Sequence, residues 1–472
     1  MSSHLRLLAL GGALVAAVAA APARAQITAA PGWAVSSIPT PGVVQGAVVR
    51  SGSAVLVGQG SFGAGQQQIV RLDGGVATTV ATGFNSLGGF ALDGAGTLFV
   101  VDNGGNLSGA ATGDTVFAIP NALTRTTALP AVGAEVVPAG TIPAAQDVAV
   151  DGADLVVSDA VGPPSAGRVV RVSNGMVTNL ITGLAYTAGV IVDGTRLLVG
   201  NSDASFVGSV SEYTLAGVLV GPIADDLSGN YAHVLDGDGN VLVSGGLTDD
   251  FSSSTVIAVA PGGAISERAS GFTFSSEMFH DSVRDETLVL DVGVSEIAVI
   301  CRDEDDDDVC DADDACLGGS ALADAKLLLK KQGTPAGDDG LKLVGEMTVA
   351  GTIDPTVSGA RLVVADGSGT VADVAIPGGS QWSVNRSGTV WKWIDPAGLS
   401  GIVKVVVKAV PSTPGLVKLV VLGKNGAFAT TPAALPLRAA FSLDPAGQCG
   451  EVSFAGPATC AFNGRGTVVK CQ

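Results

Sequence analysis

The stretch Val148-Ala-Val-Asp-Gly-Ala-Asp-Leu-Val-Val-Ser158 decides the fold of this 472-residue chain. Two apolar segments flank a tight turn at Asp151-Gly152, where glycine adopts positive φ without steric cost. The second segment stays apolar instead of alternating with polar residues, which indicates a strand covered on both faces. We therefore expect a β-hairpin that is packed between other sheets.

This hairpin recurs six times between residues 43 and 300, and a third and a fourth strand follow it in most copies. The turns lie at Ser51-Gly52, Asp93-Gly94, Asp151-Gly152, Asp193-Gly194, Asp236-Gly237 and Arg284-Asp285. The turn glycines are 42, 58, 42 and 43 residues apart, and the long interval contains an insertion at residues 121–141. Such a period with four strands per unit predicts a six-bladed β-propeller. A β-helix has shorter rungs, and a β-sandwich does not repeat at this period.

The ring of blades must close, and the sixth copy has only three strands, the last ending at Ile300. The segment Trp33-Ala-Val-Ser-Ser-Ile38 precedes the first copy and is not part of any repeat. We predict that it pairs with residues 296–300 as the outer strand of the last blade, because this pairing removes two open sheet edges.

The pattern of residues 33–300 resembles the NHL-repeat and gluconolactonase-like propellers. These lactonases hold a divalent metal in the central channel through Glu, Asn and Asp, and that set cannot be placed residue by residue in this sequence. Four polar residues recur at or just after the ends of second strands: Asp102, Asp159, Asn201 and Asp291. Their repetition favours a structural role in satisfying turn amides.

Polar residues interrupt the first strands of several copies, where other copies have Gly, Ala, Val or Phe. They are Gln45, Gln146, Asp147, His233, His280 and Asp281, with Tyr231 and Glu277 slightly upstream of the two histidines. Two histidines beside an aspartate could bind a metal or orient an imidazole as a general base. The alternative is that these side chains satisfy polar atoms around a water-filled channel. Since no nucleophile elbow, HExxH or phosphate loop is present, no residue is assigned a catalytic role.

Residues 301–316 read CRDEDDDDVCDADDAC, with nine carboxylates and three cysteines. This density excludes a buried core, and a bound Ca²⁺ would remove the repulsion between the carboxylates. Numbered from Asp303, oxygen ligands fall at positions 1, 3, 5, 7, 9 and 12 of a calcium loop. They are Asp303, Asp305, Asp307, the carbonyl of Val309, Asp311 and Asp314. With Cys316 the run resembles a thrombospondin type 3 repeat, although Asp308 replaces the glycine at position 6. The alternative is a solvated acidic spacer.

The first 25 residues resemble a secretory signal, with a cleavage site at Ala23-Arg24-Ala25, although a membrane anchor is the alternative reading. Cleavage would give a mature chain without a membrane span, in the periplasm, at the cell surface or in the medium. Six cysteines in an exported chain favour disulfides over a zinc site, and their two groups of three leave the pairing open.

The charge changes sharply along the chain. Residues 26–300 carry −17, whereas all ten lysines lie between Lys326 and Lys470, which marks a domain boundary. The net charge of −19 argues against nucleic acid as a partner. The segments after Lys326 alternate partly between polar and apolar residues, which predicts a β-sandwich. The segment from Gln448-Cys449 to Cys471 is expected to form a disulfide-stapled terminal hairpin with a turn at Asn463-Gly464. This module resembles an uncharacterised tail of exported proteins from environmental bacteria.

The three tryptophans of the C-terminal module allow two interpretations. We expect Trp382, Trp391 and Trp393 in the core; the alternative is that Trp391 and Trp393, which point to the same face, form a glycan platform. The sequence as a whole predicts an all-β protein with four parts. They are a signal (1–25), a six-bladed propeller (26–300), an acidic calcium-binding linker (301–320) and a β-sandwich (321–472).

The function that the sequence favours is an exported calcium-binding protein, with calcium as its cofactor. Its propeller would bind or scaffold an unidentified protein, glycan or small ligand. The alternative is a metal-dependent, lactonase-like hydrolase that acts in the propeller channel.

Overall fold

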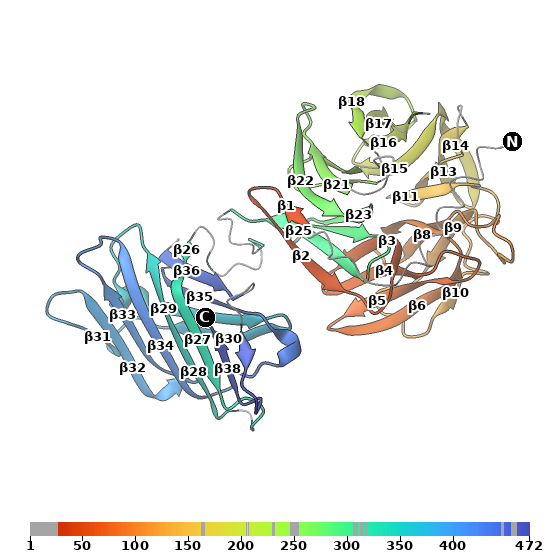
Figure 1. The fold of residues 1–472 in the computed structure, drawn as a ribbon. Coiled ribbons are helices and arrows are strands. Elements are labelled where there is room, and N and C mark those ends of the chain that lie inside the picture. Colours follow the sequence, from red (N-terminus) through yellow and green to blue (C-terminus); the bar gives the residue numbers. More distant parts are fainter. Residues whose placement is uncertain are drawn as a thin grey trace. The chain divides into compact units, whose positions relative to one another are not determined.

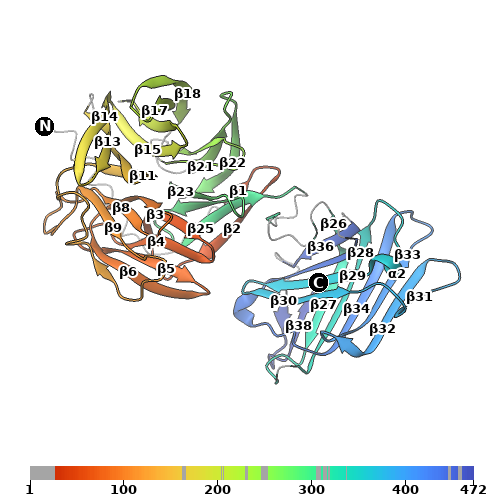
Figure 2. The ribbon, with the colours of Figure 1, turned by 180° about the vertical axis from the view of Figure 1, so that it is seen from behind.

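A computed structural model describes residues 27–161, 166–203, 205, 207–228, 232–245, 254–304, 310–311, 316, 319–335, 337–444, 448–454 and 460–472. The predicted signal lies outside these residues. The chain divides into two compact units, Met1–Arg302 and Asp303–Gln472, and both are built almost entirely from strands (Figures 1 and 2). The described helices are α2 (Pro355–Ser358) and a 3₁₀ turn (Pro432–Ala434). Neither is long and apolar enough to cross a membrane.

The first unit is a six-bladed propeller. The inner strand of each blade contacts the inner strand of the next, in a ring from β3 to β23 and back to β3. Blade 1 has β3 (Val44–Ser51), β4 (Ala54–Gly60), β5 (Gln67–Asp73) and β6 (Val76–Phe84), and blade 2 has β7 (Leu87–Leu92), β8 (Leu98–Asp102) and β9 (Thr115–Ile119). Blade 3 has β11 (Ala145–Asp151), β12 (Asp154–Asp159), β13 (Gly167–Ser173) and β14 (Met176–Leu184).

The other half of the ring follows the same plan. Blade 4 has β15 (Tyr186–Asp193), β16 (Arg196–Ser202), β17 (Val207–Thr214) and β18 (Leu219–Ser228). Blade 5 has β19 (His233–Leu235), β20 (Val241–Gly245), β21 (Ser254–Val259) and β22 (Ile265–Phe272). Blade 6 has β23 (Ser275–Asp281), β24 (Glu286–Asp291) and β25 (Glu296–Arg302).

Neighbouring blades enclose hydrophobic clusters, which explains the continuously apolar strands. Leu155 and Val157 pack in a cluster with residues of blade 2, whereas Val156 between them packs with Val190 and Leu197 of blade 4. Successive side chains of a strand point to opposite faces, so an apolar run in β12 fills two interfaces at once.

The last blade is closed by an N-terminal strand, as predicted. The strand β2 (Trp33–Pro39) pairs antiparallel with β25, from Trp33 opposite Arg302 to Pro39 opposite Glu296. Each strand therefore extends beyond the predicted ends at Ile38 and Ile300. Two short strands cover other outer edges: β1 (Thr28–Ala29) pairs with β22, and β10 (Leu129–Pro130), from the insertion, pairs with β6.

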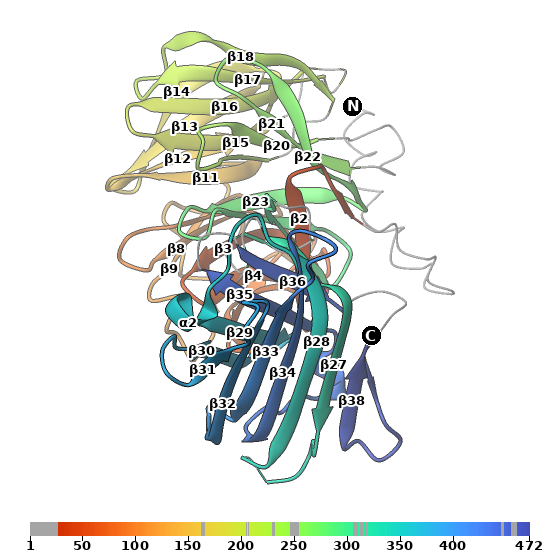
Figure 3. The same ribbon diagram turned by 90° about the vertical axis from the view of Figure 1, so that its left-hand side faces the viewer.

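The second unit contains two sheets, as a β-sandwich requires (Figure 3). The five-stranded sheet has β26 (Ser320–Ala321), β36 (Gln448–Ser453), β35 (Leu437–Asp444), β29 (Ala360–Asp366) and β30 (Gly369–Ile376). The eight-stranded sheet has, in order, β31 (Trp382–Val384), β32 (Val390–Leu399), β33 (Ile402–Ala409), β34 (Leu416–Gly426), β28 (Asp339–Thr348), β27 (Ala323–Lys330), β38 (Val468–Cys471) and β37 (Ala461–Phe462).

The three tryptophans of this unit belong to one hydrophobic core. The exposed fractions of Trp382, Trp391 and Trp393 are 6%, 8% and 0%. The glycan-platform alternative is therefore wrong, because rings buried in the core cannot stack on a sugar. The terminal hairpin turns near the predicted place, but it is shorter than expected: it consists of β37 and β38 and is closed by the disulfide Cys460–Cys471. Gln448–Ser453 belongs to β36 of the other sheet instead.

Candidate functional site

Close packing brings the inner strands together at their N-terminal ends. The pairing of five of them shifts register there, for example between Ala145 and Asp147 in β11. Glycines allow the approach: an added Cβ on Gly88 would lie 2.4 Å from the carbonyl oxygen of Gln146. One on Gly89 would lie 1.9 Å from Oδ1 of Asp147. Gln146 itself is buried.

Asp147 links blades 3 and 4 through backbone amides. Its Oδ1 accepts the N–H of Val148 at 2.8 Å, and its Oδ2 accepts the N–H of Val190 in β15 at 2.9 Å. The side chain is buried, and burial raises the pKa of Asp147 to about 7, although the two hydrogen bonds favour the ionised form. Asp147 thus satisfies a backbone amide at an irregular point of the neighbouring blade.

Glu277 is a second buried carboxyl, and it comes from the opposite blade of the ring. Burial, followed by the negative charge of Asp147, raises the pKa of Glu277 well above its ordinary value. Blades 3 and 6 are opposite in a ring of six, and the charge of Asp147 nevertheless acts on Glu277. Oε1 of Glu277 has no hydrogen-bond partner among the described residues. Two carboxyls that repel each other at such a site retain a proton near neutral pH.

His233 packs between blades 4 and 5. An added Cβ on Gly189 would lie 2.5 Å from Nδ1 of His233, and one on Gly200 would lie 2.0 Å from its Cε1. Neither ring nitrogen has a hydrogen-bond partner within the part of the chain that the structure describes. Burial lowers the pKa of His233 to about 3, so the ring is neutral and fills space left by the two glycines.

His280 has different neighbours. Its Nδ1 lies 3.2 Å from Oγ1 of Thr287, and its Nε2 lies 3.6 Å from Oδ1 of Asp285. Burial lowers the pKa of His280 despite nearby carboxylates, which act in the opposite direction. Nε2 of His280 also faces Gly237 of blade 5, whose added Cβ would be 3.9 Å away. The ring of His233 contacts blade 4, whereas the ring of His280 lies near the turn of blade 5. The two rings therefore have different neighbours.

Asp281 belongs to the interface between blades 6 and 1. Its Oδ1 accepts the N–H of Val283 at 3.0 Å, and its Oδ2 lies 3.9 Å from Nη1 of Arg50. Arg50 also forms an ion pair with Glu286. Among the described residues, no group of three or more His, Cys, Asp or Glu side chains is placed to hold a metal ion.

The repeated polar residues after the second strands satisfy amides at the start of their own blades, as predicted. Asp102 accepts the N–H groups of Asn85, Ser86 and Gly104. Asp291 accepts the N–H groups of Thr273 and Phe274. Asp159 accepts the N–H of Ala144, and the side-chain oxygen of Asn201 accepts the N–H of Tyr186. Their repetition was the signal that identified this role from the sequence.

The acidic linker is described in part. Asp303 is 1% exposed, and Oδ1 of Asp311 accepts the N–H of Glu304 at 2.9 Å, which folds the run back on itself. Asp305, Asp307, Val309 and Asp314 lie outside the described residues. All six cysteines are disulfide-bonded, and Cys316–Cys449 joins the two groups of three. The zinc alternative is excluded because no thiolate is free to bind the metal.

Some contacts join blades and strands that are far apart in the chain, and the sequence did not indicate them. The ring of Trp33 in the closing strand lies 4.2 Å from the guanidinium of Arg268 and 5.3 Å from that of Arg302. Arg302 also pairs with Asp285 at 3.0 Å. No local pattern could indicate these partners, because they come from opposite ends of the propeller sequence.

No protein-family model matches the chain, and no curated protein matches it in sequence. Solved structures with a similar arrangement include a putative gluconolactonase, 13% identical over 58% of this chain and 97% of that one, with a TM-score of 0.41. The calcium-binding protein regucalcin from Agrobacterium tumefaciens is 12% identical over 56% of this chain and 91% of that one, with a TM-score of 0.39.

A calcium structure of the carbohydrate-active family AA12 from Trichoderma reesei is 14% identical over 60% of this chain and 99% of that one. Its TM-score is 0.44. Similarity at this level transfers no activity, and the propeller is defined here by its own strand pairing.

Proposed function

We propose that this chain is an exported, calcium-binding protein whose propeller is a rigid scaffold for a partner rather than a catalytic centre. The observation that carries the proposal is the use of Asp147, whose two carboxylate oxygens both accept backbone N–H groups. The neutral ring of His233 packs on glycines, and Asp281 faces Arg50. These polar residues of the inner strands therefore support the ring itself. Disulfide bonding of all six cysteines agrees with an oxidising compartment.

Two of the predicted calcium ligands lie among the described residues. Asp303, at position 1, is buried. Asp311, at position 9, caps the N–H of Glu304 within the same run. The disulfide Cys316–Cys449 fixes the end of the run to β36. A calcium loop would be held in place by this anchor.

The calcium proposal is tested by calorimetric titration of the mature protein with Ca²⁺. The variant Asp305→Asn/Asp307→Asn removes two predicted ligands, and the control Asp306→Asn/Asp313→Asn removes the same charge from two positions of the run that are not predicted ligands. We expect the first variant to lose affinity by at least about tenfold and the control to bind within about twofold of the native protein. Equal losses in both variants would identify a plain acidic spacer and overturn the proposal.

A hydrolase in the channel is the second candidate, and the buried pair Asp147–Glu277 is the observation that favours it. A buried carboxyl such as Glu277, whose raised pKa keeps it protonated near neutral pH, is available for acid–base chemistry if a substrate reaches it. The test measures acid release from lactones by the mature protein with added Ca²⁺, Mn²⁺ or Zn²⁺. Turnover that is lost in Glu277→Gln would favour the hydrolase, whereas the scaffold proposal expects no turnover that depends on Glu277.

A further inference from the structure

One face of the eight-stranded sheet carries nine of the ten lysines of the protein. Six neighbouring strands contribute them, from β32 through β33, β34, β28 and β27 to β38. The residues are Lys392, Lys404, Lys408, Lys418, Lys424, Lys342, Lys326, Lys330 and Lys470. Strand register places them on a common face: Lys404 and Lys342 flank Leu422, for example, and Lys342 and Lys470 flank Leu328. We call this surface the lysine face.

The opposite side of the same sheet is the core of the sandwich. Residues between the lysines in sequence, such as Leu341, Val405 and Val469, are buried in the core. The lysine side chains are exposed or half-buried, so the sheet shows the alternation of a two-layer sandwich with one solvated face.

The positive charge of the lysine face is almost uncompensated. Among the described residues in register on it, Glu346 is the one carboxylate, and it is ion-paired with Lys418. Lys408 lies directly opposite Lys418 on the next strand, an arrangement of like charges that costs stability. Arginines of the five-stranded sheet behave differently: Arg361 pairs with Asp373 and Arg438 with Glu451.

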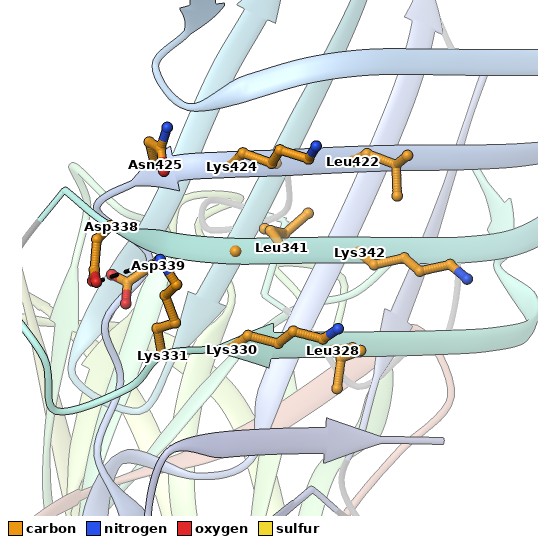
Figure 4. A pocket seen from close by; sticks show the side chains of 12 residues that line it. Leu328, Lys330, Lys331, Asp338, Asp339, Leu341, Lys342, Leu422, Lys424 and Asn425 are labelled. Atoms are coloured by element: carbon orange, nitrogen blue, oxygen red, sulfur yellow. Dashed lines mark ion pairs between the residues drawn. The ribbon is translucent and has the colours of Figure 1, made fainter.

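A hollow of about 360 Å³ opens at one end of the lysine face (Figure 4). Lys330, Lys342 and Lys424 line it from three adjacent strands, and within the described chain none of the three has an ion-pair partner. Two carboxylates also line it: Asp338 lies 3.5 Å from Lys331 at the edge, and Asp339 is buried and accepts the N–H of Phe428. Three ammonium groups around one hollow form a favourable place for an anionic substituent.

We propose that the lysine face binds a linear acidic polysaccharide. Charge complementarity calls for an anionic partner, and the lysines span about 24 Å across six strands at a spacing of about 4.8 Å. Half-buried aliphatic residues, among them Val344, Val406 and Val420, lie between the lysines and would contact the apolar edges of the sugar rings. The proposal goes beyond the proposed function, since it gives the C-terminal unit a partner that does not depend on calcium.

Other anionic partners fit less well. Single-stranded nucleic acid is usually held by stacking on aromatic side chains, and the described residues in register on this face include no aromatic one. An anionic bilayer is an extended plane, so it would be repelled by a molecule whose net charge is −19. A narrow polymer would contact the lysine face alone.

The experiment measures binding of the mature protein to immobilised polygalacturonate at low and high salt. The variant Lys342→Gln/Lys404→Gln/Lys424→Gln removes three charges from the face. The control Arg361→Gln/Arg386→Gln/Arg465→Gln removes three charges elsewhere in the unit. We expect the lysine variant to lose affinity about tenfold or more, the control about twofold or less, and binding to weaken with salt. Equal thermal midpoints would show that the lysine variant is folded.

Several outcomes would overturn the proposal. The first is an equal loss in both variants, which would mean attraction by net charge alone. The second is binding to anionic vesicles or to poly-uridylate with no binding to polygalacturonate. The third is self-association of the protein that the lysine variant abolishes, which would identify the acidic surface of a second copy as the occupant.

Discussion

The buried carboxyl pair makes Glu277→Gln a stabilising substitution at alkaline pH. In the folded protein the pKa of Asp147 lies at about 7 instead of 3.8, and that of Glu277 is also raised. Groups with raised folded-state pKa values contribute their full stability below the unfolded-state values, and this stability is lost as the pH rises through about 7. Glutamine keeps the shape of the side chain and removes one of the two charges.

The shift of Asp147 sets the scale of such a cost. A rise from 3.8 to about 7 is about three pKa units, and each unit is about 1.4 kcal/mol, so ionising Asp147 costs at most about 4 kcal/mol. Burial is the cause that raises the pKa of Asp147, and this cost remains in the variant. The gain comes from Glu277, whose ionisation is opposed by its own burial and then by the charge of Asp147. We therefore expect Glu277→Gln to gain about 1–2 kcal/mol over the native protein at about pH 8, and little at about pH 4.

The assay is urea denaturation of the native protein and the variant across this pH range, with calorimetry to separate the transition of the propeller from that of the second unit. Asp147→Asn serves as a comparison: it also removes a buried charge, but its amide retains one acceptor for the two N–H groups, so at about pH 8 it should be less stable than Glu277→Gln. A difference between Glu277→Gln and the native protein that does not change with pH would refute the interaction of the two carboxyls.

Three further predictions test other contacts. Gly200→Ala should cost about 1–3 kcal/mol because its Cβ would lie 2.0 Å from Cε1 of His233, and a double-mutant cycle with His233→Ala should remove most of this cost. Trp33→Leu should lower the stability of the propeller by about 1–3 kcal/mol through lost stacking on two guanidinium groups, and an unchanged urea midpoint would contradict this role. Cys316→Ser/Cys449→Ser removes a disulfide between cysteines that are 133 residues apart in the sequence, and it should destabilise the second unit by about 2–5 kcal/mol. The calorimetric transition of the propeller should not change.

Much of the fold could be predicted because repetition makes the sequence redundant. Six hairpin turns at a regular period fix the number of blades, and the missing strand of the last copy identifies β2 as its replacement. The amide-satisfying residues after the second strands were recognised for the same reason. The disulfide pairing could not be predicted, since the contact Cys316–Cys449 is decided by which strands of the sandwich lie side by side.

The candidate site was less predictable than the fold. The sequence placed His233 and His280 in adjacent blades and so suggested a joint site. Each ring in fact packs against a different neighbour, because the direction in which each side chain points depends on how the adjoining blade packs against it. The partnership of Asp147 and Glu277 joins blades that are far apart in sequence but opposite in the ring, which no local pattern reveals.

By itself the sequence determined that this protein is all β, that its first part repeats six times, and that an acidic run separates it from a lysine-bearing module. The repeat period, the turn residues and the charge are properties of the local sequence, and they do not depend on which distant segments pack together. Only the tertiary structure decided which side chains interact or share a surface: two buried carboxyls from opposite blades of the propeller, and nine lysines on one face of one sheet. Such groupings depend on ring order and strand register, which arise when distant segments pack against each other.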